Sequence, residues 1–137
     1  MLNQRPLTKI KVGMEASCSK IITDRDTKLF AEISGDKNPL HLDEEFAKNS
    51  RYKKRIAHGM HYASFFSSIF GTQIPGSGCV IFEQNFKFRI PVYIGEEVLA
   101  TVRVTKVDIA KKKIFFETIC KVNTKIVMKG NAGISVP

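Results

Sequence analysis

Apolar and polar residues alternate along the second half of the chain, in four consecutive stretches. These stretches span residues 80–90, 98–105, 113–122 and 125–134. Alternation with a period of two residues is typical of a strand with one buried and one solvated face. The turns between the stretches are short, so the pattern predicts an antiparallel meander of consecutive strands. A fifth strand near residues 14–21 is expected to join this sheet.

The first half of the chain shows helical periodicity instead. Residues 23–35 predict a short amphipathic helix, with Thr23 as its N-cap and Gly35 as a left-handed stop. The apolar stripe of this helix consists of Leu29, Phe30 and Ile33. Asp43 is placed to cap a second small helix over residues 43–48.

Residues 58–71 contain the most apolar helical pattern of the chain. Apolar side chains cover most of the predicted circumference, which is typical of a buried helix. Three polar positions, His61, Ser64 and Ser68, fall on one narrow stripe. A sheet with one apolar face must cover that face, and only this helix is apolar enough to do so. We therefore predict an α+β protein, with a curved antiparallel sheet wrapped around a central helix in one domain spanning residues 1–137.

The balance of charge favours polyanionic partners. The chain carries 22 Lys and Arg against 13 Asp and Glu, a formal net charge of +9, which suits nucleic acid, anionic lipid or a phosphorylated small molecule. No RNA- or DNA-binding motif is recognisable, and no stretch reaches the roughly 18 apolar residues of a membrane span. Basic clusters at residues 51–55 and 111–113 are typical of solvated turns. We expect neither nucleic acid nor a membrane as partner.

Cysteine usage and the N-terminus indicate the compartment. Cys18, Cys79 and Cys120 are far apart and odd in number, which predicts reduced thiols rather than disulfides or zinc ligands. Residues 1–13 lack the apolar core of a secretory signal. We expect a cytoplasmic protein, with an organellar matrix as the alternative because the first 14 residues carry no acid.

The loop at residues 34–45, SGDKNPLHLDEE, holds the candidate chemistry. Pro39 stops the preceding helix, so the loop presents Asp36, Asn38 and His41. An aspartate and a histidine that share a water molecule can take a proton from it or return one. No Ser or Cys is spaced to form an acyl-enzyme triad with His41, and one Asp with one His is a short ligand set, so we expect no metal. Addition or elimination of water fits these residues best.

Gly59 is a candidate hydrogen-bond donor to a negatively charged oxygen, through its backbone N–H. It opens the predicted buried helix, where backbone N–H groups have no helical partner and a ligand can approach closely. Such an amide can stabilise the developing enolate of a thioester. Each residue also has an ordinary interpretation: Asp36 as a turn acid, His41 as a surface ring and His58 as an N-cap.

Four short motifs occur together in the chain. They are D-x-N-P-x-H at residues 36–41, I-A-H-G-M at 56–60, A-S at 63–64 and F-x-x-P-V-x-x-G-E at 88–96. In order and spacing they resemble the MaoC-like, (R)-specific enoyl-CoA hydratase family. The resemblance implies a hot-dog fold, a homodimer or higher homo-oligomer, and no cofactor beyond a coenzyme A or acyl-carrier-protein thioester as substrate.

The resemblance also implies residue roles in hydrating a trans-2-enoyl-CoA to a (3R)-hydroxyacyl-CoA. Asp36 and His41 would activate the water, with Asn38 helping to position it. The Gly59 amide would bind the thioester oxygen. Ser64 would orient Asp36 from the helix. Dehydration would use the same groups in reverse.

Other functions remain open at this point. A (3R)-hydroxyacyl-acyl-carrier-protein dehydratase would suit the charge of +9, because carrier proteins are acidic. A thioesterase is a weaker possibility on the same fold. From a different class, the chain could be a non-catalytic acyl-CoA or nucleic-acid binding module.

Two features depart from the family pattern. His61 stands where an aliphatic residue is usual, which bears on the shape of the acyl pocket. Residues 50–55, SRYKKR, are more basic than the family leads one to expect. They could meet the phosphates of coenzyme A, an acidic carrier protein or nothing.

Overall fold

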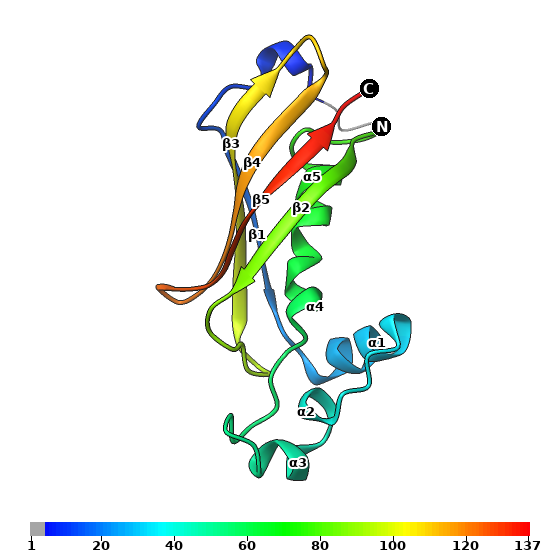
Figure 1. Ribbon diagram of the computed structural model, residues 1–137, viewed down its shortest axis with the longest axis vertical. Coiled ribbons are helices and arrows are strands. Elements are labelled where there is room, and N and C mark those ends of the chain that lie inside the picture. Colours follow the sequence, from blue (N-terminus) through cyan, green and yellow to red (C-terminus); the bar gives the residue numbers. More distant parts are fainter. Residues whose placement is uncertain (1–4) are drawn as a thin grey trace.

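A five-stranded antiparallel sheet forms the body of the protein in a computed structural model that describes residues 5–137. The strands are β1 (Glu15–Ile21), β2 (Val80–Phe88), β3 (Glu97–Asp108), β4 (Lys113–Val122) and β5 (Lys125–Ser135). Their order across the sheet is β1-β3-β4-β5-β2. The sheet curves around a helical segment, as Figure 1 shows. The predicted α+β arrangement of sheet and central helix, including the fifth strand, is confirmed.

The predicted meander is wrong at one connection. Strand β2 pairs with β5, not with β3, so only β3, β4 and β5 form consecutive hairpins. Residues 91–95, interpreted as a turn, instead belong to a connection over residues 89–96 that leads from β2 at one edge of the sheet to β3, beside the opposite edge strand. On the way, Tyr93 forms an isolated bridge with Ile56. A segment of that length can either form a hairpin turn between adjacent strands or connect two strands that are not adjacent. The alternation of apolar and polar residues does not distinguish these two connections.

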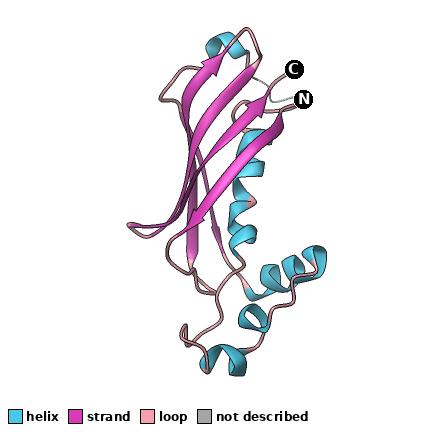
Figure 2. Cartoon of the chain, viewed as in Figure 1, coloured by secondary structure: helices cyan, strands magenta, loops and turns pink. Residues whose placement is uncertain are grey.

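The central helical segment consists of α4 (Gly59–Ala63) and α5 (Phe65–Thr72), which meet at Ser64. It runs along the sheet in Figure 2. Phe66, Ile69 and Phe70 are almost completely buried, and Phe70 contacts Phe116 of β4 with ring centroids 4.9 Å apart. The expected burial of this segment is therefore confirmed, except at Met60, which is exposed.

Three short helices and their loops cap one end of the sheet (Figure 1). They are α1 (Asp24–Ser34), α2 (Pro39–Leu42) and α3 (Glu44–Lys48), while a 3₁₀ turn, η1 (Leu7–Lys9), precedes β1. The predicted caps are present: the Thr23 hydroxyl accepts from Asp26 N–H, Gly35 is left-handed, and Asp43 caps α3. Helix α2 was not predicted. No helix among residues 5–137 is long and apolar enough to cross a membrane.

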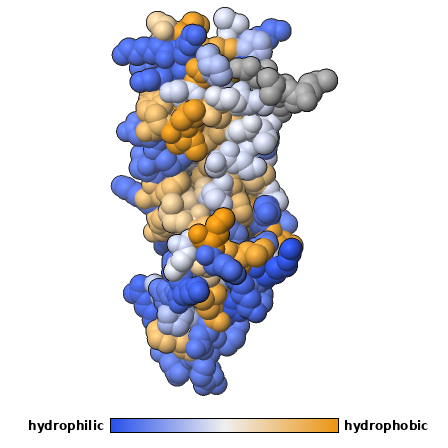
Figure 3. Space-filling view, turned by 90° about the vertical axis from the view of Figure 1, so that its right-hand side faces the viewer, coloured by the Kyte–Doolittle hydropathy of each residue, from blue (hydrophilic) through white to orange (hydrophobic). Residues whose placement is uncertain are grey.

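Strand β2 leaves apolar side chains uncovered in the single chain. Val80, Phe82 and Phe88 are each more than 40 % exposed, although their alternation predicted a buried face. Strand β2 is also an edge strand, with one side unpaired. Apolar side chains gather over the middle of the face shown in Figure 3. Exposed apolar surface of this kind marks an interaction site.

All three cysteines are free thiols, as predicted. Cys18 and Cys79 are half-buried and Cys120 is buried. Burial raises the pKa of Cys120 to about 12, so this thiol is an inert part of the core.

Candidate active site

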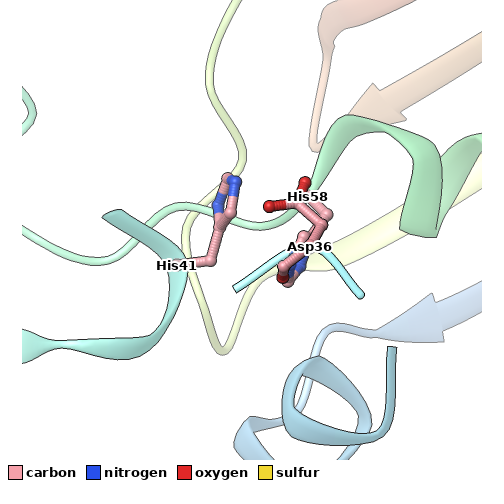
Figure 4. A group of neighbouring side chains, drawn as sticks. All are labelled: Asp36, His41 and His58. Atoms are coloured by element: carbon pink, nitrogen blue, oxygen red, sulfur yellow. The ribbon is translucent and has the colours of Figure 1, made fainter. Parts of the chain in front are cut away.

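Asp36 and His41 meet at the capped end of the sheet, as the sequence predicted. Asp36 follows the end of α1, and His41 lies on α2. Together with His58, which precedes α4, they bring their nitrogen and oxygen atoms within 4.8 Å of one another. Figure 4 shows the Asp36 carboxylate turned toward the His41 ring. Three segments that are separate in the sequence therefore build one cluster.

His41 is held in a single tautomer. Its Nδ1 lies 2.7 Å from the carbonyl oxygen of Ile56, and a carbonyl only accepts, so Nδ1 carries the proton and Nε2 keeps a lone pair. His41 as a whole is only 9 % exposed. Burial lowers the pKa of His41 most, while the Ile56 carbonyl and Asp36 act in the opposite direction. The imidazole is therefore neutral near pH 7 and suited to accept a proton.

Hydrogen bonds within the loop fix the position of Asp36. Its carboxylate oxygen Oδ1 accepts from the Asn38 amide at 3.1 Å, and its own amide donates to the Ser34 hydroxyl at 3.1 Å. The carboxylate is nevertheless exposed and free to contact a substrate water. A fixed backbone with an accessible carboxylate is what the predicted role of Asp36 requires.

Asn38 has a different place from the one predicted. Its side-chain oxygen accepts from the Leu40 amide at 3.1 Å and caps α2. Asn38 does not line the cavity beside Asp36 and His41. The structure gives it the role of starting α2, which carries His41, because asparagine before proline is a favourable N-cap. Its predicted part in positioning water is thus indirect.

His58 is a member of the cluster that the sequence reasoning missed. It had been interpreted as an N-cap, but its side chain makes no cap hydrogen bond. Instead Nε2 donates to the Asp36 backbone carbonyl at 3.0 Å, and the ring stacks on His41 with centroids 4.0 Å apart. Two signals were available in the sequence: the place of His58 in the I-A-H-G-M motif at residues 56–60, and its apolar neighbours Ile56 and Ala57.

A cavity of about 490 Å³ opens beside the cluster. Asp36, His41, His58 and Gly59 line it, together with the aromatic rings of Tyr62 and Phe88. This volume lies in the range of small-molecule sites. The cluster therefore lines a cavity that is partly open to solvent, and Asp36 is its exposed member.

Gly59 lines this cavity as the first residue of α4, where an amide has no partner within the helix. The reason for a glycine differs from the one expected. A Cβ built on Gly59 would lie 2.6 Å from Cε1 of Phe88, so the close neighbour that requires a glycine here is the Phe88 ring of β2. Any side chain at position 59 would push that ring.

The prediction that Ser64 orients Asp36 is wrong within this chain. The Ser64 hydroxyl donates to the His61 carbonyl one turn earlier, as serines in helices commonly do. Ser64 also lines another cavity, of about 710 Å³, between α1, β1 and the central helical segment. The polar stripe was derived correctly, but it faces α1 and not the loop at Asp36.

His61 lies on that same stripe and faces α1. Its ring stacks on Phe30 with centroids 5.4 Å apart, and its Nδ1 is buried without a partner among residues 5–137. Burial lowers the pKa of His61 most, with Asp26 acting in the opposite direction. His61 belongs to the packing of α1 and does not line the cavity at Asp36.

The chemistry of Asp36, His41 and His58 could in principle hold a divalent ion. Their geometry favours proton transfer instead. The two imidazole rings stack with planes inclined by 29°, so their lone pairs run beside each other and do not converge on one point. We therefore interpret the cluster as an acid–base pair supported by a second histidine.

Comparison with known proteins shows the family of this chain. Residues 6–131 match the MaoC like domain family. The chain belongs to this family. It is 45% identical to an (R)-specific enoyl-CoA hydratase of Rhodospirillum rubrum, over 93% of this chain and 89% of that protein. It is 36% identical to a mitochondrial 3-hydroxyacyl-[acyl-carrier-protein] dehydratase of Arabidopsis thaliana, over 95% and 80%.

Solved structures identify the fold. The (R)-hydratase from A. caviae involved in PHA biosynthesis superposes with a TM-score of 0.91 at 35% identity, covering 94% of this chain and 98% of that one. The fold expected from the sequence motifs, a hot-dog fold, is thereby confirmed.

Proposed function

We propose that this protein is a hydro-lyase that adds water to a trans-2-enoyl-CoA and forms a (3R)-hydroxyacyl-CoA, reversibly. The observation that carries the proposal is the Asp36–His41 pair, which faces a cavity with a neutral imidazole and an accessible carboxylate. The similarity of the protein to an (R)-specific enoyl-CoA hydratase, over 93% of the chain, supports the same reaction.

The pair supplies both proton movements of the reaction. A water held between the Asp36 carboxylate and Nε2 of His41 loses a proton to the pair as its oxygen bonds to the β-carbon. The double-bond electrons move toward the thioester carbonyl and form an enolate. The α-carbon then takes the proton back from the pair, so one water is consumed and no other reactant is needed. General acid–base catalysis of this kind contributes roughly 10²–10⁴-fold.

The Gly59 amide is the proposed donor to the enolate oxygen. It lines the same cavity as the acid–base pair and has no partner within its own helix. An amide fixed at that place needs no reorganisation when the negative charge develops. Loss of one such donor typically costs about 3 kcal/mol.

The coenzyme A part of the thioester is proposed to bind to Arg51 and Arg89. Both guanidinium groups are exposed and line the cavity that contains Asp36. Arg51 is braced by Tyr52, whose hydroxyl accepts from Nη2 at 2.6 Å. Within the basic stretch at residues 51–55 it is the arginine at the cavity, and coenzyme A offers phosphates of the opposite charge.

The experiment that tests the function is turnover of crotonyl-CoA. We expect loss of the conjugated thioester absorbance without release of free thiol, and a product oxidised only by a (3R)-specific hydroxyacyl-CoA dehydrogenase. Thiol release would indicate a thioesterase, and binding of the ester without turnover would indicate a non-catalytic module. An (S)-product would contradict the stereochemistry.

A second candidate is dehydration of (3R)-hydroxyacyl-acyl-carrier protein, and the charge of +9 favours it. The reacting groups would be the same, but the partner would be an acidic protein. Competition between butenoyl-CoA and the butenoyl carrier protein in one assay separates the two, because steering by charge makes carrier-protein turnover fall steeply with salt.

We further propose a homodimer that covers the exposed apolar side chains of β2. Strand β2 has an unpaired edge and exposes Val80, Phe82 and Phe88, and pairing of two such edges would cover the unpaired backbone groups of both. Phe88 also lines the cavity, so a partner would help close it. We place the activity in the cytoplasm, in line with three free thiols. Sedimentation of the intact chain tests the dimer.

A further inference from the structure

Arg55 is a buried arginine that joins the three short helices of the capping region. Its side chain is only 8 % exposed. Nε donates to the backbone carbonyl of His41 at 2.7 Å, and Nη1 donates to Asp24 Oδ1 of α1, also at 2.7 Å. A longer contact of 3.4 Å reaches Glu44 of α3. One guanidinium group thus contacts α1, α2 and α3.

Residues 55 and 56 hold His41 from both sides. The Arg55 side chain binds the His41 peptide oxygen, while the carbonyl of Ile56 accepts from the His41 ring. The Ile56 amide also donates to the carbonyl of Leu40 at 3.4 Å. Backbone and imidazole of His41 are therefore both positioned by the segment that leads into α4.

We propose that Arg55 is a positioning residue for the hydration reaction, which sets where the His41 imidazole meets the Asp36 carboxylate by clamping α2 to α1. The proposal rests on the proposed function for its kinetic consequences. Arg55 does not line the cavity in which the substrate is proposed to bind. Its contribution is the geometry of the pair, and misplacement of a catalytic group by about 1 Å can cost about 10²-fold in rate.

The charge of Arg55 also acts on His41. Four groups around His41 influence the pKa of its imidazole: the Asp36 carboxylate, the His58 ring, the Ile56 carbonyl and the Arg55 guanidinium. Burial lowers the pKa of His41 most, Ile56 and Asp36 raise it, and His58 and Arg55 lower it. Because the Arg55 charge disfavours a second positive charge beside it, Arg55 helps keep the imidazole neutral.

Two variants of Arg55 separate geometry from charge. In Arg55→Lys the charge stays, but an ammonium cannot reproduce the fork that binds His41 and Asp24 together. We expect kcat to fall about 10- to 100-fold with KM within about twofold. In Arg55→Met the charge is lost as well, so the pKa of His41 should rise and the acid limb of kcat/KM should move to higher pH.

Asp24 provides a variant that is less damaging to the fold. Its carboxylate is half-exposed and binds both Arg55 and, at 2.9 Å, Lys28 one turn along α1. Asp24→Asn should lower kcat in the same way as Arg55→Lys, because the clamp loses its charged anchor. Lys28→Met is the matched control: it removes the other partner of Asp24 and should leave kcat and KM unchanged.

The pKa of His41 is measured directly by NMR titration of the imidazole signals, of which the chain has three. This readout does not depend on turnover, so it tests the proposal even if crotonyl-CoA is not hydrated. The proposal predicts an upward shift in Arg55→Met and a much smaller one in Arg55→Lys. Wild-type kcat in Arg55→Lys and Asp24→Asn, an unmoved His41 pKa in Arg55→Met, or an equal loss of kcat in Lys28→Met would each overturn it.

Discussion

The imidazole ring of His58 stacks on that of His41, with centroids 4.0 Å apart. His58 donates through Nε2 to the backbone carbonyl of Asp36. It therefore contacts His41 through its face and Asp36 through its edge. A single buried ring sets the separation of the two groups that would share the water.

Substitution of His58 by Phe tests this relationship. His58→Phe keeps an aromatic ring against His41 but removes the donor to the Asp36 backbone carbonyl. We expect the fold to persist and kcat to fall about tenfold, because the Asp36 backbone is no longer fixed. The pKa of His41 should also rise, since His58 lowers it. An unchanged kcat in steady-state assays would show that the stack has no part in catalysis.

The contact of Gly59 with Phe88 leads to a second prediction. Gly59→Ala places a Cβ where the structure leaves 2.6 Å to the Phe88 ring, so the ring or the Gly59 amide must move. We expect kcat/KM to fall about tenfold or more, as for a displaced oxyanion donor. Gly71→Ala is the control in α5, where a Cβ meets nothing within 4 Å. Its activity should equal that of the wild type.

A rescue variant distinguishes strain from loss of the donor. Adding Phe88→Leu to Gly59→Ala gives the new methyl group room and should recover part of kcat/KM. If Gly59→Ala alone is fully active, the amide has no role as oxyanion donor. If the double variant is no better than the single one, the Phe88 contact is not the cause.

Prediction from the sequence succeeded for features that are determined by residues close together in the chain. Thr23, Gly35 and Asp43 mark helix ends through local hydrogen bonds and backbone angles, and all three do so in the structure. The joint placement of Asp36 and His41 followed from one rigid loop.

The sequence could not predict features that depend on distant segments. The pairing of β2 with β5 and the contact of Gly59 with Phe88 both depend on how residues 89–96 cross the sheet. His58 joins the cluster only because α2 folds back onto the start of α4. Ser64 was misplaced because periodicity places residues on a helix face but does not identify what that face meets.

His61 leads to a prediction about stability and pH. Burial lowers its pKa in the folded state below the usual value of about 6.5. Below that pH, His61 binds a proton more readily in the unfolded chain than in the folded one. The free energy of unfolding is therefore highest above a pH of about 6.5 and decreases as the pH falls below it. In His61→Leu the free energy of unfolding should decrease less as the pH falls. The remaining decrease comes from His41, whose pKa is also lowered.

The same variant should be more stable at neutral pH. It removes a buried Nδ1 that has no partner among residues 5–137, at the expense of the ring stack on Phe30. We expect the free energy of unfolding to rise by about 1 kcal/mol. Thermal denaturation between pH 5 and pH 8 measures both effects, and a steeper pH dependence in His61→Leu would contradict the assignment.

Arg51 tests the contact with the carrier group. Arg51→Ala should raise KM for crotonyl-CoA about tenfold, the loss of one charge-assisted hydrogen bond. KM for crotonyl-pantetheine, which lacks the phosphates, should not change. Lys54→Ala is the control, because Lys54 lies over the Tyr93 ring and away from the cavity. An equal rise of KM for both esters would contradict phosphate binding and would show that Arg51 acts only as part of the cavity wall.

The most direct test of the acid–base pair is the rate of crotonyl-CoA hydration by Asp36→Asn. Asparagine keeps the oxygen that accepts from the Asn38 amide, so the fold should be retained, and Asp26→Asn on α1 controls for loss of an acidic charge. We predict that kcat falls at least about 10²-fold in Asp36→Asn, with the circular dichroism spectrum and melting temperature of the wild type. Wild-type turnover by Asp36→Asn would contradict the shared-water mechanism.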